Sequence, residues 1–159
     1  MNLPESFRHY GTTVLARNSE IAHEWNIEPD GCGLSIPALS PNGFDIRFEI
    51  EQEAVTLYWG NWHTRFEPTA GVDTLIEELF GLLRDMLTPD MRVRELYAGS
   101  HPYRGLLETY DGVRWSTEHE MMLIVWNYFG KRSVRTFSNS RLPARMSKVN
   151  HDAASDRDG

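Results

Sequence analysis

Residues 72–87 read VDTLIEELFGLLRDML, and this stretch decides the predicted fold. Its large apolar residues recur at three- and four-residue intervals, which places them along one side of an α-helix. They are Val72, Leu75, Ile76, Leu79, Phe80, Leu83, Met86 and Leu87. Thr88-Pro89 ends the pattern, because the residue before a proline avoids helical geometry. Since most helical stability comes from packing an apolar side against other structure, we expect this helix to cover a β-sheet.

The chain before this helix predicts a second helix and a pair of strands. Apolar residues between positions 12 and 26 roughly keep helical spacing, and the Gly- and Pro-rich residues 28–42 predict a loop. Residues 44–50 alternate strictly between apolar and polar, which is typical of a half-buried antiparallel strand. A return strand follows, and the alternation changes phase at Gly60-Asn61. Glycine often marks such a phase change, so we predict a β-bulge there.

The chain after the helix predicts strands joined by short connections. The predicted strands cover residues 92–98, 104–110, 113–117, 121–129 and 133–138. Asp111-Gly112 indicates a two-residue hairpin, and the run 121–129 is apolar on both sides, as in a central strand. We therefore predict an α+β fold with a mostly antiparallel twisted sheet of about six to seven strands. Residues 1–140 form the predicted single domain, and residues 141–159 form a predicted flexible tail, basic and then acidic.

Composition and charge narrow the classes of function. The chain has 159 residues, a net charge of -7 and one cysteine, so it cannot form an internal disulfide. Residues 1–120 hold 20 acidic and 9 basic residues, whereas residues 121–148 hold six basic and no acidic ones. We expect a cytoplasmic protein without a membrane partner, with nucleic acid disfavoured by the acidic body.

Catalytic and metal-binding motifs give little support to an enzyme. Nucleotide-binding glycine loops, zinc-protease helices and serine-hydrolase elbows are all missing from the sequence. Cys32 is a conceivable thiolate nucleophile and Glu108 a conceivable catalytic carboxylate, but a loop cysteine and a solvent-facing strand residue are the favoured interpretations. His63, His101 and His119 would have to converge from separate strands to hold zinc. We therefore assign no catalytic residue, metal or cofactor.

Aromatic residues supply the main candidate for a binding surface. Tyrosine and tryptophan are enriched where proteins bind partners, and several are predicted to lie on the sheet face away from the helix. Together with nearby His and Glu side chains, the candidate binding residues are Tyr58, Trp62, His63, Glu67, Trp115, His119, Trp126 and Tyr128. The favoured interpretation is that the N-terminal segment covers this face as a second core layer.

The acidic body and the missing motifs favour binding over catalysis. The leading hypothesis is a small non-catalytic binding protein, in the manner of an immunity or antitoxin-like inhibitor of a basic protein partner. The alternative is an enzyme or small-molecule binder with a pocket lined by aromatic, His and Glu side chains. A homodimer formed through an edge strand is a third hypothesis.

Overall fold

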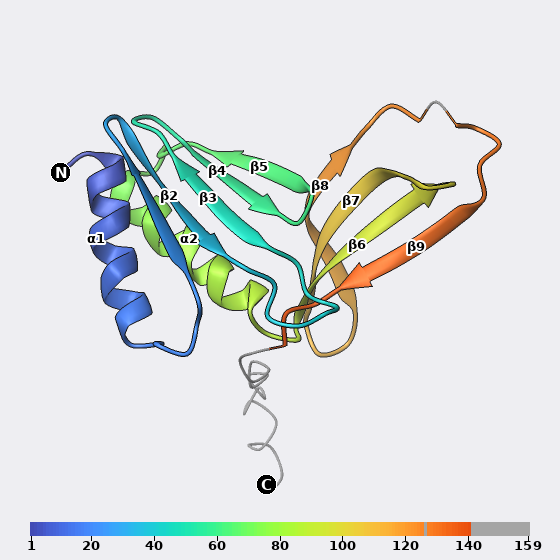
Figure 1. Cartoon of the computed structure of the whole chain (residues 1–159), viewed down its shortest axis with the longest axis horizontal. Helices are drawn as coiled ribbons and strands as arrows, with labels where there is room; N and C mark the ends of the chain where they lie inside the picture. The colour runs from blue at the N-terminus through green and yellow to red at the C-terminus, as the bar shows by residue number, and fades with distance from the viewer. Residues whose placement is uncertain (126, 141–159) are drawn as a thin grey trace, which may run out of the picture.

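The computed structural model describes residues 1–125 and 127–140, and this part of the chain folds into two helices and nine strands (Figure 1). The strands form two antiparallel sheets: sheet A has the order β1-β2-β3-β4-β5, and sheet B has the order β8-β7-β6-β9. The helices are α1 (Leu3–Ala16) and α2 (Val72–Met86). The strands are β1 (Glu24–Glu28), β2 (Gly31–Ile36), β3 (Ile46–Ile50), β4 (Val55–Trp59), β5 (Trp62–Phe66), β6 (Met91–Ala98), β7 (His101–Tyr110), β8 (Trp115–Met122) and β9 (Arg132–Phe137). The predicted α+β class is confirmed, although the strands are more numerous than predicted and are divided between two sheets.

Helix α2 is the predicted covering helix, and its apolar side is buried as expected. Leu75, Leu79 and Leu83 are among its buried residues. The ring of Phe80 lies 4.9 Å from that of Phe7 in α1, and both rings contact Phe48 of β3. The two helices therefore pack together on one face of sheet A and share its core.

Helix α1 lies about ten residues earlier than the predicted helix at 12–26, so that prediction of its position is wrong. The helix begins at Asn2, whose side chain accepts a hydrogen bond from the Glu5 backbone while the Glu5 side chain accepts one from the Asn2 backbone. This reciprocal capping box fixes the start of the helix. Glycine is a poor helix former, but a Cβ at Gly11 would lie 2.7 Å from the Phe80 ring, so glycine allows the two helices to approach.

Sheet A is a meander whose two faces follow the predicted alternation. Ile46, Phe48 and Ile50 are buried, whereas Arg47 and Glu49 lie on the outer face. The predicted bulge at Gly60-Asn61 is wrong, because these two residues form the turn between β4 and β5. Gly60 has φ +67° at the first turn position, as two-residue hairpins favour. The reversal of the chain, rather than an extra residue, changes the phase of the alternation.

Sheet B differs most from the prediction. Strand β8 ends at Met122, so the predicted central strand at 121–129 does not form. The described residues between β8 and β9 instead make a connection without strand structure. The predicted two-residue hairpin at Asp111-Gly112 is a four-residue loop, in which the Asp111 carboxylate accepts hydrogen bonds from the Val113 and Arg114 backbones. That side-chain bonding closes the wider turn.

Residues just after β9 bond to the loop between β2 and β3, chiefly through one buried side chain. Asn139 is completely buried, its Oδ1 accepts hydrogen bonds from the Leu39 and Phe44 backbones, and its Nδ2 donates to the Phe44 carbonyl. The predicted tail at 141–159 lies outside the described residues. No helix in the described ranges is long and apolar enough to cross a membrane.

Candidate binding surfaces

The predicted aromatic surface does not exist as one face. Tyr58 and His63 lie side by side on the outer face of sheet A, with their ring centroids 5.6 Å apart. The Tyr58 hydroxyl donates to Glu49, and the Arg47 guanidinium lies 4.0 Å from the centre of the Tyr58 ring. The hydrogen bond to Glu49 raises the pKa of Tyr58. Since Tyr58 and Trp62 occupy opposite faces of sheet A, the structure does not bring them together.

Trp62 lies between the two sheets and is 1% exposed. Its Nε1 donates a 2.9 Å hydrogen bond to the buried carboxylate of Glu95 in β6, which also accepts from the Tyr97 hydroxyl. A Cβ on Gly105 of β7 would lie 2.2 Å from the indole, so the ring packs flat against bare backbone. Burial, followed by the bond to Glu95, raises the pKa of Tyr97. Trp62 therefore has a structural role and holds the two sheets together. In the sequence, the glycine at position 105 inside a predicted strand could have indicated that another residue packs closely against the backbone there.

His119 forms another contact between the sheets. Its ring meets Phe66 of β5 edge-on at 5.4 Å. Burial lowers the pKa of His119 below its ordinary value, and the adjacent Glu118 carboxylate partly opposes that shift. The joint between the sheets therefore favours a neutral imidazole.

This pKa predicts a pH-dependent stability that depends on His119. Because the folded state lowers the pKa, the unfolded chain binds more protons as the pH falls below the ordinary histidine value of about 6.5, and the fold loses stability there. We expect the difference in unfolding free energy between the wild type and His119→Gln to shrink between pH 7.5 and pH 5. Urea titrations of both proteins would measure it. A difference that stays constant over this range would contradict the prediction.

The remaining candidate residues are scattered. Glu67 is exposed just after β5, Tyr128 is exposed in the connection between β8 and β9, and Trp126 lies outside the described residues. Cys32 is in β2 rather than in a loop, and its Sγ lies 3.6 Å from the Pro4 carbonyl oxygen. Burial raises the pKa of this thiol, which opposes a role as a nucleophile. In residues 1–125 and 127–140, no three His, Cys, Asp or Glu side chains are grouped as metal ligands.

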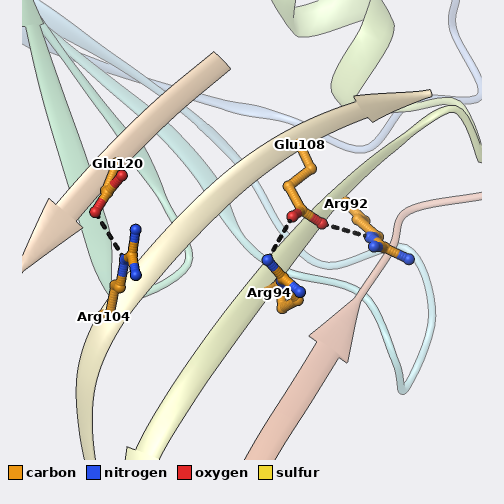
Figure 2. Close-up of polar contacts among 5 residues, drawn as sticks. All are labelled: Arg92, Arg94, Arg104, Glu108 and Glu120. Carbon is orange, nitrogen blue, oxygen red and sulfur yellow. Dashed lines mark hydrogen bonds and ion pairs between the residues drawn. The ribbon is translucent and has the colours of Figure 1, made fainter. Parts of the chain in front are cut away.

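The outer face of sheet B carries a ladder of charged side chains (Figure 2). Glu108 of β7 accepts from Arg92 at 2.7 Å and pairs with Arg94 at 3.0 Å, both from β6. The Glu108 side chain is 5% exposed, so the favoured interpretation of a solvent-facing residue is wrong. The Arg92 guanidinium also lies 3.9 Å from the centre of the Trp115 ring. The Trp115 ring thus packs against a side chain of its own sheet.

Exposed apolar side chains are concentrated at the far end of sheet B. Phe129 is fully exposed, Ile124 is 89% exposed and Val134 of β9 is 57% exposed. The complete group, here called the apolar segment, comprises Met122, Leu123, Ile124, Tyr128, Phe129 and Val134. Contiguous exposed apolar residues of this size mark interaction sites more often than ordinary surface. Figure 1 shows the connection between β8 and β9 at the end of the molecule farthest from α1.

Formal charge is divided between the two sheets. Residues 1–90, which form both helices and sheet A, hold 15 acidic and 5 basic residues, a net charge of -10. Residues 91–140, which include sheet B, hold 5 acidic and 7 basic residues, a net charge of +2. Comparison with protein-family models, curated proteins and solved structures gave no match.

Proposed function

We propose that this chain is a non-catalytic binding protein whose acidic half, α1, α2 and sheet A, receives a basic protein partner. The observation that carries the proposal is the division of charge, with -10 on residues 1–90 against +2 on residues 91–140. A surface of one sign attracts partners of the other sign and speeds their association. Asp73, Glu77 and Glu78 lie exposed along α2, which covers the face of sheet A opposite to its outer face.

An inhibitor of the immunity or antitoxin type is the concrete form of this proposal. Such a protein needs no reactive group, because it acts by covering a basic surface of its partner. The alternative is a pocket lined by aromatic, His and Glu side chains, with His63, Glu67 or His119 in it. His63 lies on the outer face of sheet A, whereas His119 packs against Phe66 on the other face, so the arrangement gives that alternative no support.

The test compares two substitutions that change net charge by the same amount. Partners are captured at 50 mM salt, identified by mass spectrometry, purified and then bound to three proteins: wild type, Glu77→Lys and Glu118→Lys. Glu77 is exposed on α2 of the acidic half, whereas Glu118 is exposed on β8 of sheet B. We expect a basic partner whose association rate falls several-fold with Glu77→Lys and with added salt, but not with Glu118→Lys. A partner that is not basic, or equal effects of the two substitutions, would refute the proposal.

A further inference from the structure

Strand β9 is an open edge of sheet B. It pairs on one side with β6 in a regular register from Val93–Phe137 to Ala98–Arg132. On its other side it has no neighbouring strand within the described residues, and its residues 132–136 are all exposed. Figure 1 shows β9 as the outermost strand of this sheet. An open edge presents unpaired backbone donors and acceptors that another strand can bind.

Strand β9 lacks several of the features that normally protect an edge, namely proline, a bulge and a covering element within the described residues. Strand β8, the other edge of sheet B, has an irregular register at Leu107/Glu108 and contacts β5. Strand β9 is regular and contains no proline and no acidic residue. Its two arginines are turned toward its own sheet: Arg135 lies 4.6 Å from the centre of the Tyr97 ring, and Arg132 lies 5.0 Å from that of Tyr103. Inward-pointing charges of this kind are one way in which proteins protect an edge, so a partner strand has to pair beside these two guanidinium groups.

The apolar segment adds exposed apolar surface to this edge. Its aromatic members, Tyr128 and Phe129, are 72% and 102% exposed and by themselves offer roughly 260 to 440 Å². That is about a third to a half of the 800 Å² or so that a standard interface buries on each partner, and the four aliphatic members add to it. A run that is apolar on both sides, as 121–125 is in sequence, is typical of segments buried on both sides.

We propose that β9 pairs antiparallel with β9 of a second copy of this chain, about a two-fold axis near Val134. The two copies of sheet B then form one continuous eight-stranded sheet. In this register Val134 faces the second copy's Val134, Ser133 faces its Arg135, and Arg132 faces its Thr136. No cation stands opposite another cation, which is the arrangement that destabilises paired strands.

This pairing covers the apolar segment and leaves the acidic half free. All members of the segment except Val134 precede β9, so an antiparallel partner places the C-terminal end of its own β9 toward them. The contact uses sheet B, whereas the proposed basic partner uses α1, α2 and sheet A. The proposal therefore stands independently of the proposed function.

Light scattering on the full chain tests the proposal. We expect a mass of twice the chain's 18.4 kDa at tens of micromolar protein, and a return to the single-chain mass for Val134→Lys. Val113→Lys is the matched control, because Val113 is 86% exposed in the loop between β7 and β8, and it should remain a dimer. Circular dichroism with thermal unfolding checks that both variants are folded. A wild type at the single-chain mass, or a dimer unaffected by Val134→Lys, would overturn the proposal.

Cysteine cross-linking gives a second readout that locates the axis. The native Cys32 is buried, so the cysteine introduced by Val134→Cys supplies the thiol that is accessible to cross-linking in the described part of the chain. Directly opposed residues of antiparallel strands have Cβ atoms about 5 Å apart, close enough for a disulfide or a short bis-maleimide to join them. We expect a covalent dimer from Val134→Cys and none from Val113→Cys. A single-chain protein that instead sediments with phosphatidylserine vesicles through the apolar segment would overturn the proposal in favour of a lipid surface.

Discussion

Replacing Trp62 with alanine should remove most of the stability of this protein. Truncating a buried tryptophan costs about 3 to 5 kcal/mol, and Trp62 is 1% exposed. Losing the indole donor also leaves buried Glu95 with one hydrogen bond fewer, which adds on the order of 1 to 3 kcal/mol. Because domains are stable by only about 5 to 15 kcal/mol, we expect Trp62→Ala to be largely unfolded at 37 °C. Urea denaturation followed by circular dichroism measures the loss.

The control for this prediction is Trp115→Ala. Trp115 lies on the outer face of sheet B and contacts the Arg92 guanidinium, a contact worth on the order of 1 kcal/mol. Gly105→Ala tests the same joint from the other side, since its new Cβ would meet the indole at 2.2 Å. We expect it to destabilise the fold by about 1 to 3 kcal/mol or more. Equal losses for Trp62→Ala and Trp115→Ala would show that the sheets are joined elsewhere.

Replacing Glu108 with glutamine should cost about 2 to 4 kcal/mol of unfolding free energy, the second largest effect that we expect. Its carboxylate is buried between Arg92 and Arg94, and an amide leaves two cations beside each other without a counter-charge. The arginine side chains are 25% and 40% exposed, so water recovers part of the loss. Thermal and urea unfolding at low and high salt measure the effect.

Glu120→Gln is the matched control for this substitution. Glu120 pairs with Arg104 between neighbouring strands of the same sheet face, as Figure 2 shows, but both side chains are more than one-third exposed. Exposed pairs contribute between zero and about 1 kcal/mol. We therefore expect a loss below about 1 kcal/mol for Glu120→Gln. A loss as large as that of Glu108→Gln would mean that burial does not decide the strength of these pairs.

Periodic sequence patterns predicted the helices and strands that have one side packed in the core of this chain. The three- and four-residue spacing in 72–87 and the alternation in 44–50 correspond directly to α2 and β3, because each has one side facing the core. The helix at the N-terminus was misplaced because a capping box and a contact glycine do not resemble an amphipathic pattern. The run 121–129 predicted a central strand buried on both sides, and this prediction is wrong because β8 ends at Met122 and Leu123 and Ile124 are exposed. An apolar pattern does not specify which surface covers it.

The candidate surfaces were harder to predict than the elements. Trp62 meets Gly105 only because two separate sheets pack together, and no local spacing encodes that contact. The ion pair between Arg92 and Glu108 was easier to predict. A short loop joins the predicted strands at 92–98 and 104–110, and pairing these strands places Arg92 directly opposite Glu108. The division of charge follows from counting residues once the boundary between the two sheets is known. The sequence alone does not show that boundary, because it depends on how the strands are divided between the sheets.

Asn139 has a consequence for how the molecule is made. It holds the Leu39 and Phe44 backbones across separations of 100 and 95 residues. Chains emerge from the ribosome at about 5 to 20 residues per second, so the first helix and the meander wait several seconds for this amide. Until then the Leu39 and Phe44 backbone N–H groups lack this acceptor. We therefore expect a chain that stops before residue 139 to lack the hydrogen bonds that hold the loop between β2 and β3.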